Sequence, residues 1–313
     1  AGNTMNYDIN IKSNIKNGTA IELDRISSIA HDTKEIATKA LMLKIHGASD
    51  IKPDSKLKSA LDIYLPKLSS SKKNGTLMVF ECEPFEETMK LLQLDLFNSK
   101  EEIFKLTPMA LVIQSFRAAL IETEDKDHLD KQLLKSMLKF KNNFLDTDEV
   151  FYFSNRGSIP EIEIRKNDFK KIEMLEEKIP EPKKTIVNGK LDEMKMSKCR
   201  IGLITADGLV SIITNDKAIM ESLISFMGKE VTVSGTAHYK TNGQLSHIEI
   251  IEFFQPGKND IHFSRKPKSM SLEQQVLFNL KNGKKRDVLE DLIGKWPGDE
   301  TDEEFEKLLK DLD

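Results

Sequence analysis

The chain has 313 residues, which is too long for one small core and fits two domains with additional segments. Hydrophobic residues make up 39% of it and charged residues 31%, so we expect a globular protein with a strongly charged surface. The 47 Lys and Arg residues face 51 Asp and Glu residues, and this balance excludes a protein that coats nucleic acid by charge alone.

Strand-like and helix-like patterns alternate along the first half of the chain. Alternating side chains predict a strand at 6–12, and apolar residues at helical spacing predict a long helix at about 24–45. Thr107-Pro108 indicates a helix start, because proline suits the first helical turn. The other elements predicted here are strands at 61–68, 76–83, 149–153 and 159–165 and helices at 86–97, 107–122, 127–144 and 167–179. This order predicts an α+β domain over residues 5–180.

One side of the helix predicted at 127–144 carries Lys131, Lys135 and Lys139. Residues four positions apart lie on the same face of a helix, so the three ammonium groups form a stripe. A charged stripe is typical of a helix face that contacts water. We therefore expect these three lysines to be solvated.

Cys82 and Cys199 are the only cysteines, and both lie in apolar, strand-like segments. They predict two buried free thiols and neither a disulfide framework nor a structural zinc site. A chain without disulfides is typical of a reducing compartment. No apolar run approaches the ~20 residues that cross a bilayer, and no signal-peptide pattern is evident. The sequence therefore predicts a cytoplasmic protein with no membrane contact and no cofactor.

Residues 183–255 form the second predicted domain, which follows Pro180 and Pro182, two residues that cannot continue a helix. Asp-Gly at 207–208 and Asn-Gly at 242–243 predict tight hairpin turns, because these residues tolerate positive φ. Five strands are predicted at 185–196, 199–206, 209–214, 230–240 and 244–254, with a helix at 216–227. The residues of this helix that we expect to face the core are Ile219, Leu223, Ile224, Phe226 and Met227.

Three strands, a helix and two strands in this order resemble the OB-fold, a five-stranded, partly open barrel. The segment at 228–235, Gly-Lys-Glu-Val-Thr-Val-Ser-Gly, is similar to the fourth strand of many such barrels. The resemblance covers residues 185–254 and implies a ligand across strands two and three, framed by the loops after strands one and four. The candidate nucleic-acid-binding residues there are Lys195, Lys198, Arg200 and Lys240. Strands two and three carry no aromatic residue for base stacking, so a structural or protein-binding barrel is the alternative.

The Asn-Gly turn also sets the register of the last hairpin. With 242–243 as a two-residue loop, His238 faces His247 across the ladder and Thr236 faces Glu249. The opposite, core-facing side is predicted to carry Val233, Gly235, Ala237, Ile248 and Ile250. His238, His247 and Glu249 are thus a candidate metal or pH-sensing site. The favoured alternative is a solvated outer face, because the sequence reveals no further ligand.

Residues 256–313 are predicted to be a basic linker followed by an acidic, amphipathic helical tail. Thr301 and Glu304 form a capping box for the final helix. The segment at 296–300, Trp-Pro-Gly-Asp-Glu, is similar to the endings of small bacterial antitoxins, and this resemblance implies a protein partner. The candidate partner-binding residues are Trp296, Phe305, Leu308, Leu309 and Leu312. The alternative is a terminal helix that packs on the protein's own core.

The sequence contains no phosphate-binding loop, nucleophile elbow or Cys-His pair, so no catalytic residue is predicted. The leading hypothesis is a non-enzymatic bacterial binding or regulatory protein. It would engage a protein partner, or nucleic acid, through the OB-like module and the charged tail. The alternatives are a hydrolase-type enzyme with its site in the first half and an oligomeric scaffold.

Overall fold

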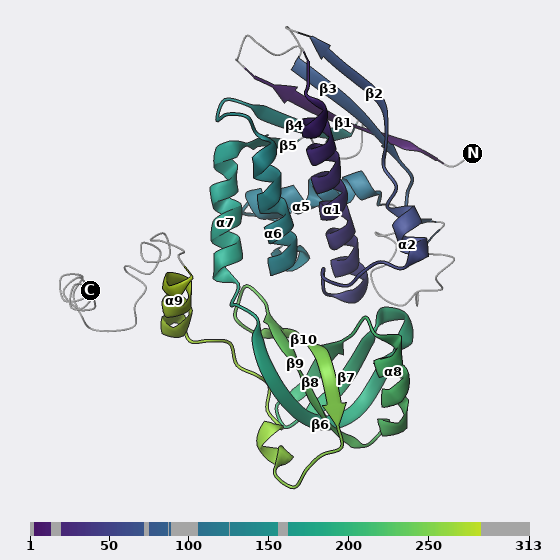
Figure 1. Ribbon diagram of the computed structural model, residues 1–313, viewed down its shortest axis with the longest axis vertical. Coiled ribbons are helices and arrows are strands. Elements are labelled where there is room, and N and C mark those ends of the chain that lie inside the picture. Colours follow the sequence, from purple (N-terminus) through teal and green to yellow (C-terminus); the bar gives the residue numbers. More distant parts are fainter. Residues whose placement is uncertain are drawn as a thin grey trace, which may run out of the picture. The chain divides into compact units, whose positions relative to one another are not determined.

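The computed structural model describes residues 3–13, 20–71, 75–86, 88, 106–124, 126–155 and 162–282. The chain divides into two compact units, Ala1–Pro267 and Lys268–Asp313. The first unit contains an α/β part, built on an open sheet, and a closed β-barrel (Figure 1). None of the helices in the described part of the chain has both the length and the hydropathy of a membrane span.

The open sheet has the strand order β2-β3-β1-β4-β5, and all its pairs are antiparallel. Burial alternates along the strands, so one face of the sheet is in the core and the other is not. The edge strand β2 is exposed over its first six residues. The strands span β1 (Met5–Lys12), β2 (Tyr64–Ser71), β3 (Gly75–Cys82), β4 (Val150–Asn155) and β5 (Ile162–Arg165).

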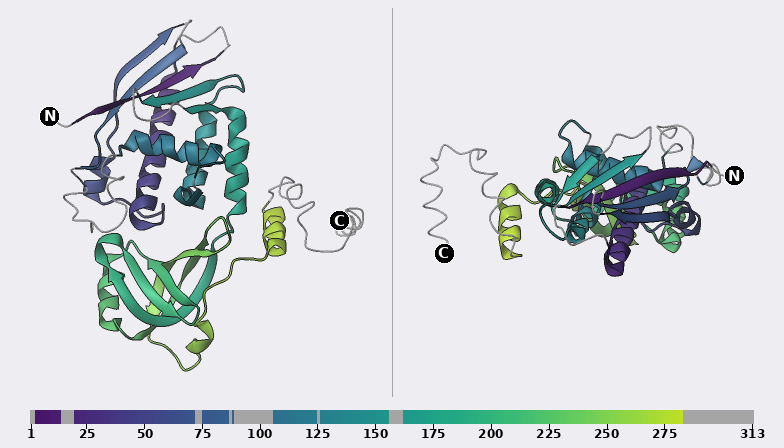
Figure 2. Two further views of the ribbon diagram at one scale, coloured as in Figure 1. Left: turned by 180° about the vertical axis from the view of Figure 1, so that it is seen from behind. Right: turned by 90° about the horizontal axis from the view of Figure 1, so that it is seen from above.

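The helices of the α/β part lie on one side of this sheet, as the views from the front and from behind both show (Figures 1 and 2). Three of them, α1, α5 and α6, begin at residues whose side chains accept a hydrogen bond from the first turn, namely Glu22, Thr107 and Asp130. The helices span α1 (Leu23–His46), α2 (Ser55–Ala60), α5 (Pro108–Leu120), α6 (Lys131–Phe140) and α7 (Phe169–Lys178), with 3₁₀ turns at Lys126–His128, Lys141–Asn143 and Lys166–Asp168.

Aromatic side chains form the centre of the α/β core. Phe140 of α6 lies edge-on to Phe116 of α5, with ring centroids 5.6 Å apart, and at the same distance from Phe151 of β4. Further rings contact this group, so α5, α6 and the sheet share one apolar cluster that also includes Phe144, Phe153 and Phe169.

The predicted lysine stripe is wrong at its first position, because Lys131 is buried at 5% exposure. Its ammonium group lies 3.2 Å from Glu176 and 3.4 Å from Glu181, and it donates to the carbonyl oxygens of Glu176 and Ile179. The contact arises because α7 packs beside α6, which the pattern of α6 alone does not reveal. Lys139, at the other end of the stripe, is exposed.

The barrel closes in the order β10-β8-β7-β6-β9, with β9 and β10 paired to each other. Only the β8–β10 pair is parallel among its ladders. This closed, mixed, five-stranded barrel is compatible with an OB-like module. Its elements are β6 (Lys183–Lys195), β7 (Arg200–Thr205), β8 (Gly208–Ile213), α8 (Lys217–Leu223), β9 (Glu230–Tyr239) and β10 (Leu245–Phe254), with 3₁₀ turns at Met196–Lys198, Ile224–Phe226 and Asp260–Phe263.

Two local predictions for the barrel are wrong. Ile224 and Met227 are 53% and 42% exposed, because α8 ends at Leu223 and the following 3₁₀ turn rotates them outward; Met220 is buried instead. Cys199 is only half-buried, because it lies in the turn before β7 with a positive φ of 51°. Cys82, at the end of β3, is a buried free thiol as predicted.

In the second unit the described helix is α9 (Leu272–Lys281), which begins with a capping box between Ser271 and Gln274. The final helix predicted from the sequence lies outside the described residues, as does most of the helix predicted at 86–97.

Candidate functional site

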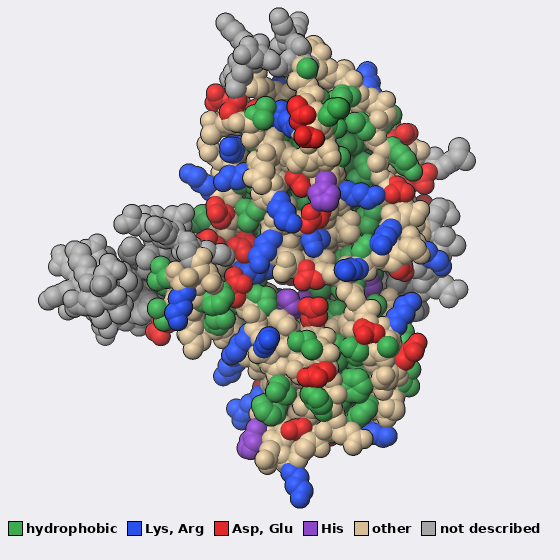
Figure 3. All heavy atoms as spheres, viewed as in Figure 1, with side chains coloured by type: hydrophobic (Ala, Val, Ile, Leu, Met, Phe, Trp, Pro, Cys, Tyr) green, Lys and Arg blue, Asp and Glu red, His purple; other side chains and the backbone are tan. Residues whose placement is uncertain are grey.

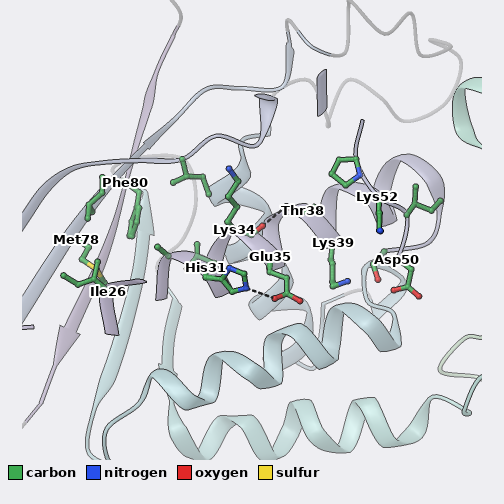
Figure 4. A pocket seen from close by; sticks show the side chains of 17 residues that line it. Ile26, His31, Lys34, Glu35, Thr38, Lys39, Asp50, Lys52, Met78 and Phe80 are labelled. Carbon is green, nitrogen blue, oxygen red and sulfur yellow. Dashed lines mark hydrogen bonds and ion pairs between the residues drawn. The ribbon is translucent and has the colours of Figure 1, made fainter. Parts of the chain in front are cut away.

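A groove of about 660 Å³ lies between α1 and the β2–β3 edge of the open sheet. Its third side is the loop at 49–53, which follows α1 (Figure 4). Its size is within the range of ligand-binding sites. We call it the α1–β2 groove.

The sheet side of the α1–β2 groove is apolar. Met78 and Phe80 of β3 form its floor with nearly buried side chains, and Leu65 of β2 is 39% exposed at its rim. Ile26 at the start of α1 and Ile63 before β2 complete this wall. Covering a contiguous apolar surface of this kind with another apolar group lowers the free energy.

The α1 side of the groove is polar, because successive turns of the helix present His31, Lys34, Glu35 and Thr38. Figure 4 shows His31 and Glu35 paired, with 3.7 Å between their charged atoms. Glu35 also accepts hydrogen bonds from Ser136 and Lys139. Burial opposes its charge, but the Ser136 bond and the Lys139 charge outweigh burial and lower the pKa of Glu35. Glu35 is therefore a fixed anion tied to α6.

Three lysines line the groove, Lys34, Lys39 and Lys52, and they differ in whether they form an ion pair. Lys34 forms an ion pair with Asp62, at 3.1 Å, whereas Lys39 and Lys52 form no ion pair with another described residue. The charge of Lys39 nevertheless favours the charged forms of Glu35 and Asp50. Lys39 and Lys52 both line the groove near Asp50 (Figure 4). Burial, and next the charge of Asp130, raises the pKa of Asp50. This end of the groove can thus receive an anionic group beside the apolar wall.

The groove adjoins an open edge of backbone. β2 pairs only with β3 in the described sheet, so no second strand lies along its outer edge there. Tyr64 and Leu68 of β2 are 62% and 42% exposed. A register shift between Tyr64 and Lys67, which contains Pro66, interrupts this edge and limits uncontrolled strand pairing. The edge is regular from Leu68 to Ser71.

Three of the four residues predicted to bind nucleic acid lie together, because Lys195 pairs with Arg200 across the β6–β7 ladder and Lys198 is in the turn between them. Arg200 donates to the carbonyl oxygen of His46 at the end of α1, at 2.7 Å, and the ring of His46 bonds to the carbonyl oxygen of Lys198. Lys195 pairs with Glu193, and Lys240 is exposed in the β9–β10 turn. The loop between β6 and β7 therefore contacts the α/β part. On the face in Figure 3, basic and acidic side chains are interspersed.

The predicted pairs of the last hairpin are confirmed, since His238 pairs with His247 and Thr236 with Glu249. The predicted two-residue loop is wrong, because Tyr239 pairs with Leu245, and a register shift between Leu245 and His247 restores the predicted pairs. The expected solvation is wrong for the histidines. His247 is 7% exposed, and the side chain of His238 is 14% exposed. The cover comes from the α/β part, where Asp50 lies close to His238. Burial, then the charges of His238 and Arg200, lowers the pKa of His247 to about 3, so this ring is neutral.

Sequence reasoning missed the α1–β2 groove altogether. Its polar wall has a signal, since His31, Lys34 and Thr38 recur at helical spacing beside the buried stripe of α1. The apolar wall has none, because Leu65 and Phe80 look like ordinary strand residues. The tail residues predicted to bind a partner, Trp296 and the four apolar residues at 305–312, lie outside the described part of the chain.

The fold and the groove together define a mixed α/β protein with a closed five-stranded barrel and an amphipathic groove in its α/β part. The sequence matches no protein-family model. Neither the curated proteins nor the solved structures with which it was compared match it.

Proposed function

We propose that this protein is a non-enzymatic binding protein that holds a short segment of a partner protein in the α1–β2 groove. The observation that carries the proposal is the combination of an apolar wall with an adjoining open strand edge. Segments that add to a sheet edge gain main-chain hydrogen bonds, and flanking pockets select their side chains. The α1–β2 groove offers the side-chain contacts, and the edge of β2 that continues from it offers the main-chain contacts.

The walls of the groove indicate the chemistry of the bound segment. Leu65, Met78 and Phe80 would cover apolar side chains, while Lys39 and Lys52 would attract a carboxylate at the other end. Lys34 is already paired with Asp62 and contributes less. The expected ligand is therefore an extended segment with apolar residues and at least one acidic residue.

The groove favours binding over the hydrolase alternative. A hydrolase needs an acid and a base that are free to exchange protons with the substrate. Asp32 accepts from the buried Asn143, and Glu35 is held by Ser136 and Lys139. Both carboxylates of this part of α1 thus have structural partners, and His31 is paired with one of them.

Selection of peptides from a display library against the full chain tests this proposal. We expect the recovered sequences to combine apolar and acidic residues. Their affinity should fall at least about tenfold, a loss of about 1.4 kcal/mol, in Leu65→Asp and in Lys39→Glu. The first variant places a charge in the apolar wall, and the second reverses the charge at the other end.

Two surface variants on the barrel serve as matched controls. Leu209→Asp changes an exposed leucine of β8, and Lys240→Glu changes an exposed lysine of the β9–β10 turn. Both should bind the selected peptides as the unchanged protein does. Peptides that bind all variants equally, or lose affinity only in the barrel variants, would reject the α1–β2 groove as the binding site.

A further inference from the structure

Three side chains of the kinds that bind metal ions meet where the α/β part contacts the barrel. Asp50 comes from the loop after α1, His238 from β9 and Glu249 from β10. One ring nitrogen and one oxygen from each carboxylate all lie within 4.8 Å of one another. Asp50 is distant in sequence from the other two, so only the folded chain brings the three together. We call them the junction triad.

The spacing within the junction triad fits shared coordination better than a hydrogen bond. Nε2 of His238 and Oε2 of Glu249 are 3.4 Å apart. A charge-assisted N–H···O bond is about 2.7–2.9 Å long. Two ligand atoms that each lie about 2.0–2.1 Å from a tetrahedral zinc ion are roughly 3.4 Å apart. The observed separation matches the second arrangement.

The neighbouring groups hold the His238 ring in place for such a role. The ring stacks on His247, with centroids 4.7 Å apart and planes at 11°. The His247 ring is fixed in turn by a 3.0 Å hydrogen bond between Nδ1 and the hydroxyl of Ser246. Nε2 of His238 is buried and has no hydrogen-bond partner. A nitrogen that is desolvated and unpaired costs free energy unless a proton acceptor or a metal ion satisfies it.

Asp50 and His238 of the triad line a small cavity, which Glu249 does not line. The cavity of about 20 Å³ is also lined by His247, and a water-sized sphere needs about 10–15 Å³. The Glu249 side chain is 51% exposed, so an ion can enter from solvent and keep water ligands. Asp130 lines the same cavity and adds to the negative field, while Lys131 there is engaged with Glu176 and Glu181.

We infer that Asp50, His238 and Glu249 bind one divalent transition-metal ion, which links the α/β part to the barrel. One imidazole nitrogen and two carboxylate oxygens suit Zn²⁺ among the common ions, whereas Ca²⁺ and Mg²⁺ prefer oxygen ligands alone. With three protein ligands, the remaining position is open to water. The site shares Asp50 with the α1–β2 groove, but its other two ligands lie in the barrel, so a loss of zinc binding in His238→Gln would leave the proposed function intact.

Calorimetric titration of metal-free, full-length protein with Zn²⁺ tests the inference, with X-ray absorption of the zinc complex. We expect one ion per chain, a Kd in the micromolar range or below, and only nitrogen and oxygen ligands. Asp50→Asn, His238→Gln and Glu249→Gln should each weaken binding at least about tenfold. His238→Gln should also remove the imidazole contribution from the spectrum.

Two variants control for adventitious binding. Glu252→Gln changes an exposed acid of β10, and His31→Gln changes the second group of candidate ligands, which lies on α1 with Asp32 and Glu35. Both should bind Zn²⁺ unchanged. Because Glu249 is half-exposed, Glu249→Gln should unfold at the same urea concentration as the metal-free parent. If another variant is unstable, the zinc affinity of Glu249→Gln is the result that tests the inference. No binding in the micromolar range, a sulfur ligand, or a loss in His31→Gln but not in Glu249→Gln would overturn the inference.

Discussion

The open sheet of the α/β part has two edges, whereas the barrel has none because β9 pairs with β10 and closes it. The difference decides where a partner can add to the backbone. In the barrel every strand has two neighbours, and the loop between β6 and β7 already contacts α1 through His46. In the open sheet β2 has one neighbour and a groove beside it. The barrel, which resembles the OB-fold, thus has no free sheet edge, whereas the α/β part, which resembles no known family, has an open sheet.

The largest expected effect concerns the two cores. Phe140→Ala should lower the free energy of unfolding by about 3–5 kcal/mol, because Phe140 contacts rings from α5 and the sheet. Leu203→Ala, its fully buried counterpart in the barrel, should cost about 2–5 kcal/mol. Urea unfolding followed by far-UV circular dichroism measures both. A cost below about 1 kcal/mol for Phe140→Ala would contradict the aromatic core.

The buried lysine of α6 comes next. Lys131→Met should cost about 3 kcal/mol, because it leaves Glu176 and Glu181 without their cation. Lys139→Met is the matched control on the same helix, and its exposed ammonium should be worth less than about 0.5 kcal/mol. Chemical denaturation of the two variants compares them directly. Equal costs would restore the interpretation of a solvated stripe.

A smaller effect is expected at the cap of α6. Asp130 accepts from the backbone N–H of Leu133 and from both the N–H and the hydroxyl of Ser49, which lines the α1–β2 groove. Asp130→Ala should therefore cost about 1–2 kcal/mol. Asp216→Ala, at the exposed cap of α8 in the barrel, should cost less because it loses one bond. Thermal unfolding ranks the two variants, and the reverse order would contradict this account.

The smallest effect is a pH dependence at the contact between α1 and the barrel. Burial lowers the pKa of His46, whose Nδ1 donates to the carbonyl oxygen of Lys198. The unfolded chain, with a histidine pKa of about 6.5, therefore binds the proton first as the pH falls. Stability should be full above about pH 6.5 and decline below it.

His46→Gln tests this dependence, because it should make the decline shallower; the rest of the decline belongs to His247, whose pKa burial lowers to about 3. His262→Gln, at an exposed position after the barrel, should leave the decline unchanged. Urea midpoints at a series of pH values measure the slopes. A slope that is unchanged in His46→Gln would assign the decline to other groups.

Local patterns in the sequence predicted local structure well. The pairing of His238 with His247 was predicted, although the two-residue turn was not correct: the loop is longer, and a register shift between Leu245 and His247 compensates for it. Thr107-Pro108 was enough to start α5. The same kind of information predicted the strand and helix order of the barrel.

What the patterns missed depends on residues from distant segments. Lys131 is buried by α7, and the outer face of the last hairpin is covered by the loop that contains Asp50. The α1–β2 groove likewise forms from one helix, one loop and two strands. No window of the sequence contains such a surface, so its residues carry no periodic signal that distinguishes them.

The most direct test of the central claim is hydrogen exchange of the full chain with and without a selected peptide. The account predicts slower exchange of the backbone amides of β2, above all at Leu68–Ser71, and of the α1 residues that line the α1–β2 groove. It predicts no change in β7 and β8 of the barrel. Protection confined to the barrel strands, or no protection in β2, would contradict binding at the open edge.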